Sequence, residues 1–61
     1  MTINKAIEIE EESANGMEKL ADVFKDFGKN EHAEACAKNA AEHREVAEWL
    51  KSLKKLMEVD E

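Results

Sequence analysis

The sequence predicts an all-α fold: a two-helix antiparallel hairpin that assembles as a helical bundle, either a dimer or a larger oligomer. The 61 residues contain no Pro and no Tyr and are rich in Ala, Glu, Lys and Leu, a composition that favours helix. Apolar residues recur at helical spacing in both halves of the chain. A short stretch that opens with Gly28 separates the halves. We therefore expect one domain, a single helical hairpin over residues 1–61.

The first helix is expected over residues 3–27. Thr2 suits the N-cap position, because its hydroxyl can accept a hydrogen bond from a backbone amide in the first turn. One apolar stripe consists of Ile3, Ile7, Ala14, Met17, Ala21 and Phe24. A second stripe makes the helix apolar over more than one neighbour would cover, and its members are Ile9, Leu20, Val23 and Phe27. The first helix therefore needs a second neighbour.

Gly16 lies inside this helix, where glycine costs about 1 kcal/mol relative to alanine. The sequence leaves open whether Gly16 breaks the helix, although the apolar stripe keeps its phase on both sides. The register expected for the hairpin places His43 opposite Gly16. A glycine there would leave room for the imidazole ring.

The turn is expected at residues 28–30 and the second helix at residues 31–58. Gly28 suits the left-handed position that ends a helix, and Asn30 suits the next N-cap. So short a connection forces the helices to lie antiparallel. This register sets Lys51 opposite Glu8. The second helix carries a seam with a period near 3.5, formed by Ala33, Cys36, Ala37, Ala40, His43, Val46, Ala47, Leu50, Leu53 and Met57.

Self-association is expected because a chain of this length buries only about 60% of its surface and is marginal alone. Cys36 is the single cysteine, so an internal disulfide is excluded. The expected interface comprises the second stripe of the first helix together with Val46, Trp49, Leu50 and Leu53. The Trp49 side chain is expected to face a second chain or a protein partner, since tryptophans often anchor interfaces.

The charge of the chain restricts its partners. A formal net charge of -6 disfavours nucleic acids and anionic membranes and favours basic protein surfaces. No stretch is long and apolar enough to cross a bilayer, and the N-terminal residues lead into an amphipathic pattern instead of a signal core. The lone thiol agrees with a cytoplasmic location.

Two histidines and the cysteine are the candidate chemical groups. His32 and Cys36 are four residues apart and could reach one metal ion in an oligomer, but a single chain offers too few ligands. We expect no metal and no cofactor, with Cys36 in the core and His32 exposed. We also expect no enzymatic activity, because two helices provide no evident concave site.

His43 lies on the apolar seam and allows three interpretations. It is a polar core residue that fixes register or oligomeric state, an exposed edge residue, or a ligand or switch residue. Burial would favour the neutral imidazole, whereas an acidic neighbour would favour the charged form.

The segment Cys36–Leu50 contains the stretches Ala41-Glu42-His43-Arg44 and Ala47-Glu48-Trp49-Leu50. It resembles a run in short phage and prophage proteins of Gram-positive bacteria, and it covers a quarter of the chain. The resemblance implies a phage context, in which proteins of this size often inhibit host or defence proteins, and it implies no catalytic residue. The layout also resembles the Rop family of plasmid RNA-binding hairpins. The acidic first helix departs from that family, so RNA binding is not implied.

The function expected first is a small acidic phage-type interaction protein that self-associates and binds or inhibits a bacterial protein. One alternative is an oligomer that sequesters a nucleotide signal, with phosphate meeting Lys51, Lys54 and Lys55. Another is a structural or assembly component of a phage.

Overall fold

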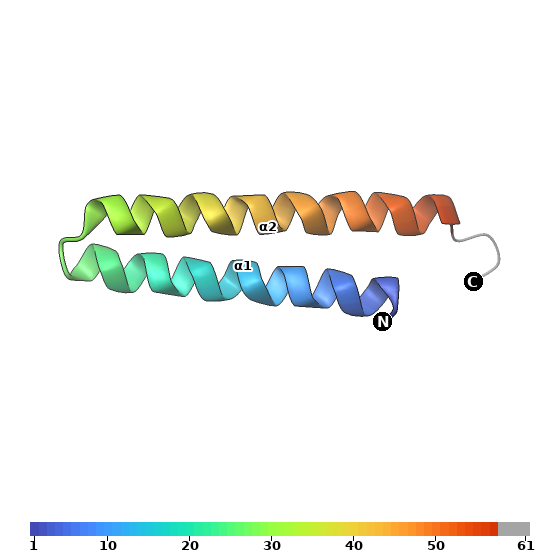
Figure 1. Cartoon of the computed structure of the whole chain (residues 1–61), viewed down its shortest axis with the longest axis horizontal. Coiled ribbons are helices and arrows are strands. Elements are labelled where there is room, and N and C mark those ends of the chain that lie inside the picture. Colours follow the sequence, from blue (N-terminus) through green and yellow to red (C-terminus); the bar gives the residue numbers. More distant parts are fainter. Residues whose placement is uncertain (58–61) are drawn as a thin grey trace.

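The computed structural model describes residues 1–57 and consists of two long α-helices, α1 (Ile3–Asp26) and α2 (Asn30–Met57). The helices lie side by side and run antiparallel, with the turn at one end and the start of α1 and the end of α2 at the other (Figure 1). No strand occurs within residues 1–57. The predicted all-α hairpin is therefore confirmed for this part of the chain. The last position of the predicted second helix, residue 58, lies outside the described residues.

The start of α1 follows from Thr2. The hydroxyl of Thr2 accepts a hydrogen bond from the backbone N–H of Lys5 at 3.1 Å, and its carbonyl accepts one from Ala6 at 3.0 Å. Thr2 is thus the predicted N-cap. The helix then continues through Gly16 without interruption. An added Cβ on Gly16 would meet nothing within 4 Å, so the expected packing of His43 against this glycine is wrong.

The turn uses one glycine in the left-handed conformation. Gly28 has a φ of 77°, which only glycine adopts without strain. Its N–H donates to the Lys25 carbonyl at 3.0 Å, and the Lys29 N–H donates to the Phe24 carbonyl at 2.8 Å. This pair of bonds is the Schellman ending of a helix. The structure therefore places Gly28 in the role that the sequence predicts.

The beginning of α2 differs from the prediction by one residue. The Lys29 carbonyl already accepts a helical hydrogen bond from Ala33 at 3.0 Å, so Lys29 occupies the N-cap position and Asn30 is the first helical residue. The N-cap assignment of Asn30 is wrong. The physical reason is the tightness of the turn, which leaves a single residue between Gly28 and α2.

The buried core is small and mostly alanine. Among residues 1–57, only Ile7, Ala14, Ala40 and Ala47 are buried, at 9%, 0%, 1% and 2% exposure. These alanines let the helix axes approach closely. Because the seam of α2 centres on Ala40 and Ala47, three other predicted seam residues are exposed, and these are Ala37, Val46 and Met57. In the described part of the hairpin, no large side chain is therefore completely buried.

Candidate interaction surfaces

One face of the hairpin carries the ion pairs that join the two helices. The Lys51 ammonium lies 2.8 Å from a Glu11 carboxylate oxygen. The Arg44 guanidinium donates two hydrogen bonds to the Glu18 carboxylate, at 2.7 and 3.2 Å, and one to the Asn15 side-chain oxygen at 2.9 Å. We call this side, defined by Glu11, Asn15, Glu18, Arg44 and Lys51, the ion-paired face.

The predicted pairing of Lys51 with Glu8 is wrong. Glu8 instead lies 2.9 Å from the Lys5 ammonium within α1. Positions three residues apart are neighbours on a helix, so Lys5 holds Glu8 locally. Lys51 meets Glu11, the carboxylate one helical turn further along.

The ion pairs shift the titration of their members. The hydrogen bond from Arg44 holds the pKa of Glu18 below its ordinary value, and that bond raises the pKa of Arg44 in turn. The hydrogen bond with Glu11 likewise raises the pKa of Lys51. All of these side chains remain exposed to solvent. Exposed pairs contribute little to stability, so their main effect is to fix the register of α1 against α2.

The second face of the hairpin exposes large apolar side chains. Six of the residues predicted to form an interface are exposed, and we call them the apolar face: Ile9 at 37%, Leu20 at 39%, Val23 at 47%, Phe27 at 74%, Val46 at 41% and Trp49 at 65%. The three members in α1 and Phe27, its C-cap residue, fall within about 60° of arc, given 3.6 residues per turn. The other two predicted interface residues, Leu50 and Leu53, are half-buried between the helices.

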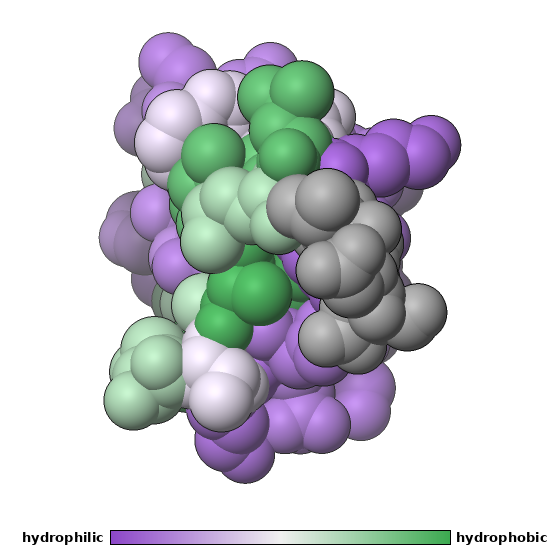
Figure 2. Space-filling view, turned by 90° about the vertical axis from the view of Figure 1, so that its right-hand side faces the viewer, coloured by the Kyte–Doolittle hydropathy of each residue, from purple (hydrophilic) through white to green (hydrophobic). Residues whose placement is uncertain are grey.

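The two faces lie on opposite sides of the molecule. On α1, the apolar stripe through Ile9 and Phe27 lies about 160° or more around the helix from Glu11 and Glu18. The same geometry separates Trp49 from Lys51 on α2, by roughly 160°. In each helix, the residues of the seam lie between those of the ion-paired face and those of the apolar face. Viewed from the open end, a band of apolar side chains runs to the surface between polar side chains (Figure 2).

His43 is neither fully buried nor unpaired. Its side chain is 33% exposed, and its Nδ1 lies 2.6 Å from an Oε1 of Glu10, a residue of α1. Since an ionised carboxylate only accepts hydrogen bonds, His43 donates Nδ1–H to Glu10. His43 is thus half-buried instead of fully buried in the core, and a carboxylate of α1 lies beside it. The sequence pattern gave no signal for Glu10, because its approach to His43 depends on the packing of the two helices.

His32 and Cys36 show no metal site within residues 1–57, where no cluster of three or more His, Cys, Asp or Glu side chains is placed to hold an ion. The His32 ring instead packs against Phe24, with a centroid separation of 5.1 Å and an interplanar angle of 42°. Cys36 is a half-buried free thiol. Both residues thus have packing roles in the single chain.

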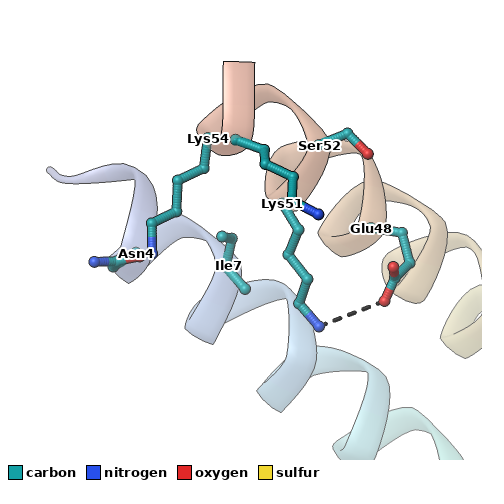
Figure 3. Close-up of a pocket in the computed structure, with 7 residues that line it drawn as sticks. Asn4, Ile7, Glu48, Lys51, Ser52 and Lys54 are labelled. Atoms are coloured by element: carbon teal, nitrogen blue, oxygen red, sulfur yellow. Dashed lines mark hydrogen bonds and ion pairs between the residues drawn. The ribbon is translucent and has the colours of Figure 1, made fainter. Parts of the chain in front are cut away.

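An open groove of about 590 Å³ lies at the end of the hairpin opposite the turn. Its lining comes from the first turns of α1 and the last turns of α2 (Figure 3), and consists of Asn4, Ile7, Glu48, Lys51, Ser52, Lys54 and Lys55. The groove is lined by neither of the histidines nor by Cys36, so the expectation that these residues have no concave catalytic site stays a prediction. The three lysines were identified from the sequence, whereas Asn4 and Ser52 were missed, since only the register brings them together.

Neither helix, within residues 1–57, combines the length and apolarity that a membrane crossing requires. Comparisons with known proteins found no matching family model, no similar curated protein and no similar solved structure. The phage context suggested by the segment Cys36–Leu50 therefore stays a prediction. The two faces and the groove are the features that bear on function.

Proposed function

We propose that this protein is a self-associating interaction protein. Two copies pack through their apolar faces into a four-helix bundle, and the acidic exterior of the bundle binds a basic surface on a bacterial protein. The observation that carries the proposal is the apolar face itself. Six large apolar side chains lie exposed on one side of a hairpin whose buried core consists of one Ile and three Ala residues.

The dimensions of the hairpin support a second copy. Its radius of gyration is 14.4 Å, whereas a compact chain of 61 residues has a radius of about 10.5 Å and one of twice that length about 13.7 Å. The hairpin is a rod of 50 × 14 × 13 Å. A second hairpin laid alongside would thicken the rod without lengthening it. The radius of gyration of one hairpin is thus already close to that of a compact dimer.

The exposed area is also consistent with an interface of ordinary size. The chain exposes 4849 Å², whereas a compact monomer of 6.9 kDa exposes about 4000 Å². The difference of about 850 Å² is close to the roughly 800 Å² that each partner buries in a standard interface. The apolar face is the part of this surface that gains most from being covered, at about 25 cal/mol per Å².

The exterior of such a bundle would be strongly acidic. Each copy has a formal charge of -6, and the carboxylates of α1 that lie away from the apolar face would stay in solvent after packing. Negative potential attracts basic protein surfaces and accelerates association with them. The resemblance of the segment Cys36–Leu50 to phage proteins is the reason to seek this partner among bacterial proteins.

Self-association is tested by placing one carboxylate on the apolar face and, in a control, one outside it. Trp49→Glu puts a carboxylate on the apolar face, whereas the matched control Ala41→Glu puts one at an exposed position of α2 outside it. Sedimentation of the parent at micromolar concentration should give a dimer. Trp49→Glu should weaken the dimer by about 30-fold or more, because an interface tryptophan is typically worth 2 kcal/mol or more. A compact monomeric parent, or equal behaviour of the two variants, would contradict the proposal.

Partner binding is tested by capture from a bacterial lysate, followed by measurement with the purified candidate protein at low and high salt. A partner held by the acidic exterior should dissociate as salt rises. Its affinity should fall in Asp22→Lys, at an exposed carboxylate of α1 away from the apolar face, and be unchanged in Ala41→Gln, at an exposed position of α2. An affinity that is insensitive to salt and to Asp22→Lys would exclude the acidic exterior as the binding surface.

A further inference from the structure

The groove at the open end lies on the same side as the ion pairs. It shares Lys51 with the ion-paired face, and Glu48, another lining residue, lies 3.4 Å from the Lys51 ammonium (Figure 3). Because this side is opposite the apolar face, a second copy packed on the apolar face would leave the groove open. A ligand could therefore enter it in the single hairpin and in the bundle alike.

The charge of the groove is opposite to that of the chain. Three lysines and one carboxylate line it, although the whole chain has a formal charge of -6. Lys51 is neutralised by Glu11 and Glu48. Among residues 1–57, no carboxylate lies within ion-pairing distance of Lys54 or Lys55. Within the part of the chain that the structure describes, their two ammonium groups therefore give the groove a local excess of positive charge.

Lys54 is the lysine most clearly directed into the groove. It is half-buried, unlike Lys55, which is exposed. Its side chain extends from α2 toward the first turn of α1, where Asn4 lies (Figure 3). Holding a lysine side chain in one conformation costs rotamer entropy. An anion bound between Lys54 and Lys55 would offset that cost by pairing with both ammonium groups.

The remaining lining residues suit an organic ligand. Ile7 is the one large side chain of the buried core, and it borders the groove beneath the lysines. The Asn4 amide and the Ser52 hydroxyl add hydrogen-bond donors. A volume of about 590 Å³ falls within the ordinary range for small-molecule sites. The groove thus combines an apolar contact with two lysines that form no ion pair within residues 1–57.

We infer that this groove binds a small phosphate monoester that carries a compact apolar group. The phosphate dianion would lie between Lys54 and Lys55, since lysine binds phosphate as a point charge. The apolar group would rest on Ile7. This inference does not depend on the proposed self-association, because it uses the opposite face.

The test uses phenyl phosphate as the probe and backbone amide NMR as the measurement. Titration should shift the signals of Ile7, Ser52 and Lys54 saturably, with a Kd of about 1 mM, a value ordinary for a fragment-sized ligand. The double variant Lys54→Gln/Lys55→Gln should weaken binding by about tenfold or more. The matched control Lys19→Gln/Lys38→Gln removes the same charge from exposed positions outside the groove and should change Kd by less than about twofold.

Three results would overturn the inference. They are an absence of saturable shifts at the groove, an equal loss of binding in both double variants, and binding of inorganic phosphate as tight as that of phenyl phosphate. The last result would show that Ile7 makes no contribution. Sedimentation of the same samples reports self-association separately, so a failure at the groove and a failure of the bundle are distinguishable.

Discussion

The ion-paired face and the apolar face differ in whether their side chains find partners within the single chain. On the ion-paired face, Arg44 and Lys51 of α2 find oxygen acceptors on α1 within the same hairpin. On the apolar face, Phe27 and Trp49 are 74% and 65% exposed. The difference indicates that the register of α1 against α2 and the stability of the hairpin have separate sources. The polar contacts fix how the helices align, whereas the large side chains of the apolar face, which could stabilise them, are exposed to water.

The largest effect is expected where the seam meets the apolar face. Leu50 is half-buried there, and Leu50→Ala should reduce the free energy of unfolding by about 2 kcal/mol or more, because it removes apolar contact and leaves a cavity. Glu12→Ala, at an exposed position of α1, should change it by less than about 0.5 kcal/mol. Urea unfolding measures both. Equal midpoints for the two variants would show that the apolar side does not carry the stability.

A smaller change in stability is expected at Gly16. It lies on the same arc of α1 as Ile9 and Leu20, and an added Cβ would meet nothing within 4 Å. Gly16→Ala should therefore stabilise the hairpin by about 1 kcal/mol through helix propensity alone. Thermal melts over a range of protein concentrations are the measurement. A melting temperature that falls instead, and falls further at high concentration, would contradict this and place a second copy against Gly16.

The ends of the helices could be predicted because their causes are local. Thr2 caps α1 through a hydroxyl bond three residues away, and Gly28 takes the left-handed position that ends it. Both signals lie within a few residues of the structure they determine. The N-cap of α2 was misassigned to Asn30 by one residue, since the sequence does not show how tightly the Schellman turn closes.

The contacts between helices could be predicted only to about one helical turn. Lys51 was expected opposite Glu8 and pairs with Glu11, because several carboxylates of α1 lie within reach and Glu8 already has a local partner. The contact between His43 and Glu10 and the shape of the groove depend on the same register. Apolar periodicity alone leaves that register undetermined by a few ångströms, which is enough to exchange one carboxylate for the next.

The smallest effect is expected on the ion-paired face, at Glu18. Arg44 holds the pKa of Glu18 below its ordinary value of 4.5, so the folded chain binds this proton less readily than the unfolded chain does. The stability contributed by the pair is therefore complete above the unfolded pKa, and it is lost as pH falls below 4.5 through the folded pKa.

Glu18→Gln removes this component. Its melting temperature should fall less than that of the parent between about pH 6 and about pH 3. The side chains of Arg44 and Glu18 are 43% and 54% exposed, so the difference should be small beside the effect of Leu50→Ala and should vanish in about 1 M salt, where the screening length is about 3 Å. Glu12→Gln, which removes a carboxylate away from Arg44, is the matched control. Equal pH dependence in Glu18→Gln and Glu12→Gln would mean that the pair fixes the register without contributing measurably to stability.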